Sequence, residues 1–226
     1  MKDDIIAKIS EIFTSVQGEG PYLGSRQTFI RFYGCNLSCR FCDTENYHFL
    51  QYSTSEILEE IMSKPHCDFL SITGGEPLLQ VIFLQELLPR LKKESFKIYL
   101  ETNGTKTDEL ISVIDFINII SMDFKLPSST GQKSYFREHE QFLKAARKKE
   151  VFVKAVITDS TLISDLKTAV EIIKGVDRGI LFVLQPDTNQ LSHNLFQKIE
   201  TYRAFACEHL ENVRIIPQVH RLVGLR

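Results

Sequence analysis

The sequence predicts an α/β fold in which about six to seven mostly parallel strands form a partial barrel. Short apolar segments with the character of strands alternate with longer amphipathic segments of helical period. Glycines and polar side chains come directly after these strands, where α/β proteins place their functional residues. Because so few strands do not close a barrel, one side is expected to stay open for a substrate.

The strand candidates are short and mostly apolar. Segment 5–13 alternates apolar with polar residues, as an edge strand or one arm of a hairpin does. The remaining candidates are 27–33, 68–73, 97–101, 116–122, 151–157, 180–184 and 213–216. Because helical segments separate most of them, they are expected to pair in parallel through right-handed βαβ crossovers.

Amphipathic helical segments lie between these strands. The helix predicted over 53–64 has Ser53 or Thr54 as its N-cap. The segment 78–93 is expected to be interrupted near Pro89, because proline removes a helical hydrogen bond. Further helices are predicted over 134–149, 162–174 and 191–210.

The composition is that of an ordinary globular protein. The chain has 226 residues, with 27 basic and 29 acidic side chains and a net charge of −2. Proteins that bind a nucleic-acid backbone usually carry a basic excess, so no nucleic-acid partner is expected. No apolar run is long enough to span a bilayer, and the N-terminus does not resemble a signal peptide, so we expect a cytoplasmic protein without a membrane partner. Since no linker or repeat is evident, residues 1–226 are interpreted as one domain.

Three of the five cysteines lie within eight residues, at Cys35, Cys39 and Cys42. Such a tight cluster in a cytosolic chain indicates a metal site rather than a disulfide framework. Three thiolates can hold a [4Fe–4S] cluster and leave the fourth iron without a protein ligand. That iron would bind the amino and carboxylate groups of S-adenosylmethionine (SAM), and an electron from the cluster would then yield a 5′-deoxyadenosyl radical.

The cysteines alone leave two other interpretations open. A structural zinc ion needs four ligands, and His48 is the nearest candidate for the fourth. Cys39 and Cys42 also have the spacing of a redox CxxC pair.

Glycine-rich and polar turns follow the later strands. In Gly74-Gly75-Glu76-Pro77, the glycines let the backbone approach a ligand closely, although an ordinary strand-to-helix turn explains the same pattern. The sequence Glu101-Thr102-Asn103-Gly104 is either a plain turn or a contact for SAM or substrate. His139 falls in a helical segment and is expected at the surface.

The spacing C-x3-C-x2-C, with Phe41 before the last cysteine and the Gly-Gly-Glu turn downstream, resembles the signature of the radical SAM superfamily. Within that superfamily, Gln17-Gly18-Glu19-Gly20, Cys42-Asp43-Thr44 and Pro217-Gln218-Val219-His220 together resemble the 7-carboxy-7-deazaguanine synthase family. The resemblance spans nearly the whole chain. It implies a partial (β/α) barrel of the radical SAM type, with 1–26 as a substrate-binding extension and 34–46 as the cluster loop.

The resemblance also implies an activity. It is the ring contraction of 6-carboxy-5,6,7,8-tetrahydropterin to 7-carboxy-7-deazaguanine with loss of ammonia, a lyase reaction of queuosine and deazapurine biosynthesis. SAM would be regenerated, and Mg²⁺ would bind a substrate carboxylate. The implied partners are the small pterin substrate, an external electron donor such as flavodoxin or ferredoxin, and a second copy of the chain in a homodimer.

Individual residues receive roles from the same resemblance. The three cysteines would hold the cluster, and Thr44 would be a ligand of Mg²⁺. The residues expected to bind SAM are Phe41, Cys42, Asp43, Gly74, Gly75, Glu76, Ser121, Asp123 and Gln185. The residues expected to contact the substrate are Val16, Gln17, Gly18, Glu19, Arg31, Thr73, His220 and Arg226. Taken singly, Arg31 is equally well explained as a structural ion-pair partner, whereas a guanidinium also suits a planar carboxylate.

Two other functions compete with this one. A glycyl-radical-activating enzyme would share the cysteine spacing, but it has no reason to keep the Gln-Gly-Glu-Gly and Cys-Asp-Thr sequences, and it would need a large protein partner. A non-catalytic zinc-binding protein would hold one zinc ion and no iron.

Overall fold

The computed structural model describes residues 5–44, 48–67 and 69–224. Within these ranges nine strands form one sheet. The strands are β1 (Ile6–Val16), β2 (Arg26–Phe32), β3 (Leu50–Ser53), β4 (Phe69–Gly74), β5 (Lys97–Thr102), β6 (Ile119–Asp123), β7 (Glu150–Ile157), β8 (Phe182–Pro186) and β9 (Val213–Ile215).

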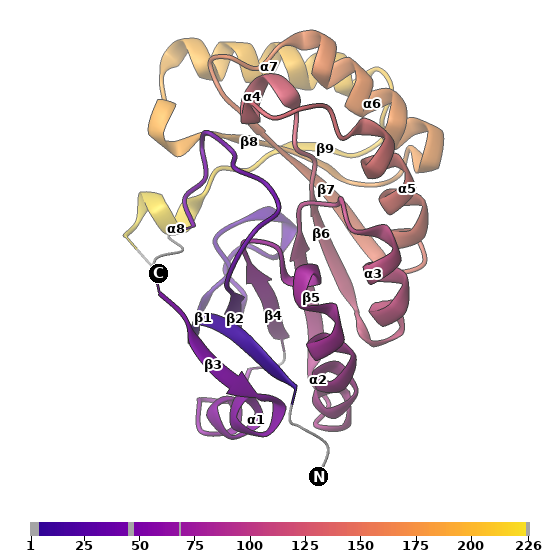
Figure 1. The fold of residues 1–226 in the computed structure, drawn as a ribbon. Coiled ribbons are helices and arrows are strands. Elements are labelled where there is room, and N and C mark those ends of the chain that lie inside the picture. Colours follow the sequence, from indigo (N-terminus) through magenta and orange to yellow (C-terminus); the bar gives the residue numbers. More distant parts are fainter. Residues whose placement is uncertain (1–4, 45–47, 68, 225–226) are drawn as a thin grey trace.

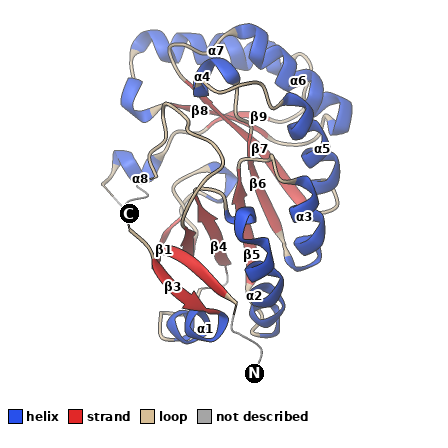
Figure 2. Cartoon of the chain, in the orientation of Figure 1, coloured by secondary structure: helices blue, strands red, loops and turns tan. Residues whose placement is uncertain are grey.

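Helices connect most of the strands. The α-helices are α1 (Thr54–Met62), α2 (Val81–Lys93), α3 (Thr107–Val113), α4 (Pro127–Thr130), α5 (Phe136–Ala146), α6 (Ile163–Asp177), α7 (His193–Cys207) and α8 (Val219–Leu222). Short 3-10 helices are η1 (Gly20–Tyr22), η2 (Pro77–Gln80), η3 (Ile114–Phe116) and η4 (Thr188–Gln190). Helices α2, α3, α5, α6 and α7 follow one side of the curved sheet (Figure 1), and the strands lie inside them (Figure 2). None of the described helices combines the length and the apolar character needed to cross a bilayer.

The strand order is β3-β1-β2-β4-β5-β6-β7-β8-β9. From β2 to β9 every neighbouring pair is parallel, whereas β1 is antiparallel to both β2 and β3. The two outer strands, β3 and β9, do not pair with each other within the described residues, so the barrel is open. The predicted α/β fold with a partial, mostly parallel barrel is therefore confirmed, and β1 is the hairpin arm expected from its alternation.

Several boundaries differ from the sequence-based expectation. Strand β3 was not predicted, because its few residues run directly into α1. Helix α2 continues through Pro89, so the predicted interruption is wrong; Leu87, Leu88 and Leu91 are all buried, and their packing holds the helix together. Strand β6 begins at Ile119 instead of at residue 116, and the short helices α3, α4 and α8 were not predicted.

The main core lies between the sheet and its helices. Ile30, Ile72, Leu100 and Ile120 sit directly beside one another on four neighbouring strands, and each is at most 1% exposed. Burying an aliphatic side chain of this size stabilises the fold by about 1.5–3 kcal/mol. Because side chains alternate along a strand, the residues before and after these four face the concave side of the sheet.

The concave face of the sheet is apolar near the starts of the strands and polar near their carboxyl ends. Tyr99, Ile119, Phe152 and Val183 form a second buried cluster near the starts of their strands. Nearer the carboxyl ends, the same face carries the polar residues of the sheet. Since parallel strands end at one edge, this arrangement brings the residues that follow β2, β4, β5, β6 and β8 together at one place.

Substitution of Ile120 by alanine should remove a fully buried side chain from the middle of the sheet. We expect Ile120→Ala to lower the free energy of unfolding by about 2–5 kcal/mol in urea denaturation. The matched control is Ile82→Ala on α2, where the side chain is 66% exposed and the change should stay within about 0.5 kcal/mol. Equal effects of the two substitutions would contradict this position of the core.

Candidate active site

A row of polar side chains crosses the concave face at the ends of the central strands. Arg31 on β2 pairs with Thr73 on β4, and Glu101 on β5 pairs with Ser121 on β6. The Thr73 hydroxyl donates to Glu101 Oε2 at 2.7 Å, and Gln17 Nε2 donates to Glu101 Oε1 at 2.9 Å. Two predicted substrate-contacting residues, Gln17 and Thr73, are therefore held together by the carboxylate of Glu101, the first residue of the Glu-Thr-Asn-Gly sequence.

The cysteine loop lies over this edge of the sheet and is tied to two neighbouring loops. The Arg40 amide donates to the Thr130 carbonyl oxygen at 3.0 Å, and Gln132 Nε2 donates to the Ser38 carbonyl oxygen at 2.7 Å. On the other side, Asn36 Nδ2 donates to Thr105 Oγ1 at 3.0 Å. The loop is therefore fastened by contacts to residues after both β5 and β6.

The donor set fits a cluster with three thiolate ligands. Burial raises the pKa of the Cys39 thiol to about 11, and the charges of Cys35 and Cys42 add to the rise. The Cys42 amide donates to the Cys39 carbonyl oxygen at 3.1 Å, so a tight turn brings these two cysteines together. The Leu37 amide donates to Cys35 Sγ at 3.4 Å, as amides commonly do to the sulfur atoms of iron–sulfur sites. With three cysteine ligands, one iron of a [4Fe–4S] cluster would remain open for SAM.

The same geometry does not favour a structural zinc site. Ligand sulfur atoms around tetrahedral zinc lie within about 4 Å of one another, because each Zn–S bond is about 2.3 Å long. Among the described residues, the group of three or more His, Cys, Asp or Glu ligand atoms within 4.8 Å of one another is Glu19, Asp43 and His220. The three cysteines do not form such a group, and neither does any set containing His48.

The Gly-Gly-Glu turn packs against the start of the cysteine loop. Gly74 has a φ of +139°, and a Cβ atom on Gly75 would lie only 2.2 Å from the Gly34 carbonyl oxygen. The Glu76 amide donates to that same Gly34 oxygen at 2.8 Å. Glycine is therefore required at 74 and 75 because the turn packs directly against the start of the cysteine loop.

The Glu76 side chain points into the protein and is fully buried. Its carboxylate accepts hydrogen bonds from the amides of Leu78 and Asn103 and from the Thr102 hydroxyl. Burial raises the pKa of Glu76 to about 7, although these hydrogen bonds oppose the rise. Because this carboxylate is occupied by protein groups, any contact of the turn with SAM would come from its backbone.

A buried ion network lies beside the polar row. The Lys154 ammonium on β7 forms ion pairs with Glu19 and, at 3.4 Å, with Asp123; Lys125 binds Asp123 at 2.8 Å. Burial alone raises the pKa of Glu19, but Lys154 and Gln218 hold it below its usual value, so Glu19 is ionised at neutral pH. Sequence reasoning missed Lys154, although a lysine within the apolar run Val151–Ile157 was a visible signal.

The lysine of the Asp-x-Lys sequence reaches the cysteine loop. Lys125 Nζ lies 5.3 Å from the centre of the Phe41 ring, within range of a cation–π contact. The structure therefore brings the predicted SAM-binding residues Phe41 and Asp123 into contact with one lysine.

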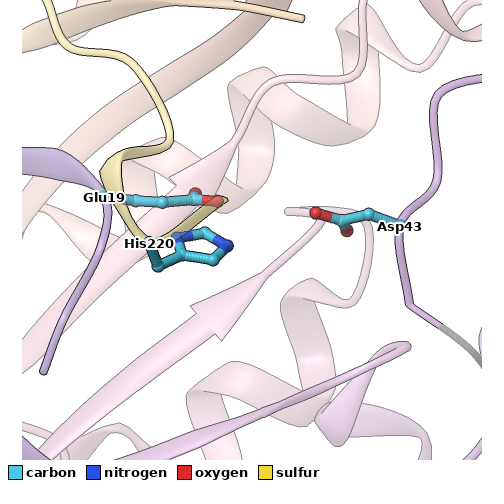
Figure 3. A group of neighbouring side chains, drawn as sticks. All are labelled: Glu19, Asp43 and His220. Carbon is cyan, nitrogen blue, oxygen red and sulfur yellow. The ribbon is translucent and has the colours of Figure 1, made fainter. Parts of the chain in front are cut away.

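The C-terminal segment closes onto the N-terminal loop and the cysteine loop. Gln218 Nε2 donates to Glu19 Oε1 at 2.8 Å and to Asp43 Oδ2 at 3.0 Å, and the Val219 amide donates to the Gly18 carbonyl oxygen at 2.9 Å. Figure 3 shows Glu19, Asp43 and His220 facing one another from three separate segments. A Cβ atom on Gly18 would lie 2.1 Å from His220 Nδ1, so only glycine fits this contact.

Three buried polar atoms in this region, from two residues, lack hydrogen-bond partners among the described residues. These atoms are Gln185 Nε2, Gln185 Oε1 and Asp123 Oδ1. Gln185 is only 1% exposed, and an unpaired buried amide costs about 1–3 kcal/mol. Both residues are predicted SAM contacts, and a bound cofactor with polar groups would satisfy them.

The remaining predicted site residues differ in whether the structure gives them a protein partner. The Arg31 guanidinium forms an ion pair with Glu11 at 3.0 Å, so it already has a protein partner and its role toward substrate stays a prediction. Val16 ends β1, and Thr44 is half-buried directly after Asp43. Arg226 lies outside the described residues.

His139 was expected at the surface, and that expectation is wrong. It is fully buried on α5, where its Nε2 lies 3.1 Å from the Asn103 carbonyl oxygen. It lies three residues before Phe142 and four before Leu143, so it shares the buried face of this amphipathic helix.

Comparison with known proteins gives a consistent family. The Radical SAM superfamily model matches residues 29–163. The chain is 38% identical to the 7-carboxy-7-deazaguanine synthase of Geobacter sulfurreducens over 96% of this chain and 97% of that protein. It is 33% identical to the enzyme of the same name from Clostridium acetobutylicum, over 96% and 95% of the two chains.

Solved structures agree in fold. The crystal structure of QueE from Escherichia coli superposes with a TM-score of 0.67 at 23% identity, covering 95% of each chain. The structure of TYW1 with a lysine-pyruvate adduct bound gives a TM-score of 0.58 at 16% identity, over 81% of this chain and 74% of that chain. At these identities the two structures bear on the fold alone.

Replacing Lys154 by methionine should leave the half-buried Glu19 and Asp123 carboxylates without their shared cation. We expect Lys154→Met to lower the free energy of unfolding by roughly 3 kcal/mol at pH 8. Glu19 stabilises the wild type above its unfolded-state pKa of about 4.5, and this contribution is lost as pH falls. In the variant, burial raises the pKa of Glu19 instead, so the difference from wild type should shrink between pH 8 and pH 5.

Urea denaturation at the two pH values measures this difference. The matched control is Lys174→Met, whose ion pair with Glu171 is exposed and whose effect should stay below about 1 kcal/mol at both. A Lys154→Met effect that is the same at pH 8 and pH 5 would argue against the ion network.

Proposed function

This chain belongs to the 7-carboxy-7-deazaguanine synthase family of the radical SAM superfamily, and from that premise we propose the reaction it catalyses. The proposed substrate is 6-carboxy-5,6,7,8-tetrahydropterin, and the proposed product is 7-carboxy-7-deazaguanine, formed by ring contraction with loss of ammonia. In this role the enzyme is a carbon–nitrogen lyase of queuosine and deazapurine biosynthesis.

One observation carries the proposal for this particular substrate. The three sequences that distinguish the family meet at a single point, where Gln218 joins Glu19 of Gln-Gly-Glu-Gly to Asp43 of Cys-Asp-Thr. A general radical SAM site needs only the cysteines and the Gly-Gly-Glu turn. The additional meeting point lies beside Gln17, which accepts from the Glu19 amide at 3.1 Å and shares the Glu101 carboxylate with Thr73. It provides polar groups for a small heterocycle.

The residues of this chain have clear tasks in such a reaction. When bound, the cluster and SAM would supply a hydrogen-abstracting 5′-deoxyadenosyl radical. Glu19, ionised and half-buried, would accept hydrogen bonds from the N–H groups of the pterin. Gln17 and Thr73, fixed by Glu101, would hold the ring from the side of the sheet. The C-terminal segment, bonded to Gly18, would limit access of water to the radical.

The donor set beside this point suits a magnesium ion. We propose that Thr44 and a substrate carboxylate would be ligands of Mg²⁺, which usually keeps several waters. Asp43, next to Thr44, brings an anionic oxygen close to Glu19 and His220.

The remaining parts of the proposal rest on family membership. We propose a homodimer in the cytoplasm, reduced by an external donor such as flavodoxin or ferredoxin. The chain is treated as one radical SAM domain, in which 1–26 contribute to substrate binding and 34–46 to the cluster. All five cysteines are free thiols, which is typical of a reducing compartment.

The competing functions are not favoured. A glycyl-radical-activating enzyme does not account for the relatives that share the chain's full length and one name. A zinc-binding protein without catalysis does not account for the match to the radical SAM superfamily.

The proposed reaction is tested by anaerobic reconstitution with iron and sulfide, followed by SAM, Mg²⁺, a reductant and 6-carboxytetrahydropterin. Mass spectrometry should detect 7-carboxy-7-deazaguanine. Cleavage of SAM without any change in the pterin would refute the substrate and leave the superfamily assignment standing.

Removal of one cluster ligand gives a separate prediction. We expect Cys39→Ala to abolish SAM cleavage, because one iron of the cluster would lose its thiolate. Cys207→Ala is the matched control, since Cys207 is an exposed free thiol and its loss should leave cleavage unchanged. Liquid chromatography of 5′-deoxyadenosine measures both, and retained cleavage in Cys39→Ala would rule out the cluster assignment.

A further inference from the structure

Asn103 occupies an unusual position directly below the cysteine loop. It follows β5, is only 3% exposed, and its Nδ2 donates both to Cys35 Sγ at 3.8 Å and to Asn36 Oδ1 at 2.9 Å. Its Oδ1 accepts from the Thr105 amide at 3.2 Å and from the Thr105 hydroxyl at 2.6 Å. Protein atoms therefore use the whole side-chain amide, which leaves no group for contact with SAM or substrate.

The backbone of Asn103 is fixed from both sides. Its amide donates to the buried Glu76 carboxylate at 2.7 Å, and its carbonyl oxygen lies 3.1 Å from His139 Nε2. A carbonyl oxygen only accepts, so His139 Nε2 carries the proton and Nδ1 is the unprotonated nitrogen, which has no partner among the described residues. The next residue, Gly104, has a φ of +68° and lies against Met122, so the turn has little freedom to move.

These contacts explain why a neutral, fully buried histidine stands behind the cysteine loop. Burial lowers the pKa of His139 to about 4, so the ring adds no charge near the cluster site at neutral pH. Its contribution is to hold the Asn103 carbonyl group and thereby the direction of the Asn103 side chain. The donor to Cys35 is in place before any cluster binds.

We propose that Asn103 is a positioning residue that sets the reduction potential of the cluster through its N–H···S hydrogen bond to Cys35. This inference rests on the proposed function only in requiring a [4Fe–4S] cluster on Cys35, Cys39 and Cys42. Adding an electron increases the negative charge on the thiolate sulfur atoms, and a hydrogen-bond donor stabilises that state more than the oxidised one. The amide of Asn103 therefore raises the potential and makes reduction of the cluster by a donor easier.

The test is a redox titration of the reconstituted full-length protein, followed by electron paramagnetic resonance without SAM or pterin. Asn103→Leu removes the donor with a neutral side chain of similar size. The ratio of reduced to oxidised cluster at a fixed applied potential should fall about tenfold, equivalent to about 59 mV for one electron. The matched control is Asn212→Leu, which makes the same substitution at an exposed asparagine that precedes β9 and contacts Gly179, so it should keep the wild-type potential.

A second variant keeps the test informative if Asn103→Leu folds poorly or binds the cluster incompletely. Asn103→Asp keeps the shape and the oxygen that Thr105 binds, and replaces the donor by an anionic oxygen, so it should also lower the potential. A potential equal to or above that of wild type, in either variant with wild-type iron and sulfide content, would overturn the proposal. Because the titration contains no pterin, a wrong substrate assignment leaves this result unchanged.

Discussion

The candidate site depends on one buried cation, the ammonium group of Lys154. It binds Glu19 of the N-terminal loop and Asp123 at the end of β6, which are distant in sequence. From Glu19 the contacts continue through Gln218 to Asp43, and from Asp123 through Lys125 toward Phe41. Both routes therefore reach the cysteine loop, and removing the cation would leave two half-buried carboxylates without compensation.

A second buried group, the Glu76 carboxylate, joins the ends of β4 and β5 beneath that loop. It holds Thr102 and the Asn103 amide, while its own amide binds the Gly34 carbonyl oxygen. The first network thus positions groups suited to substrate, and the second positions groups behind the cluster ligands. Their separation lets one scaffold provide both a binding surface and a controlled environment for the cysteines.

The sequence predicted most of what is encoded locally. The alternation of strands with helices gave the open parallel α/β fold, and the carboxyl-end positions of Thr73, Ser121, Asp123 and Gln185 are on the strands or turns expected. The sequence-based prediction failed where packing between residues that are distant in sequence determines the secondary structure. Pro89 stays inside α2 because buried neighbours outweigh the lost hydrogen bond, and β3 forms only because β1 lies beside it.

By itself, the sequence determined the residue types available for chemistry and their order: three closely spaced thiols, glycines at 74 and 75, and polar residues after successive strands. Those properties follow from composition, spacing and hydrophobic period. Only the tertiary structure decided the partners of Lys154, Glu101 and Asn103, and the burial of His139. Partner choice depends on strand register and on contacts between residues 68, 84 and 135 positions apart, which no local pattern specifies.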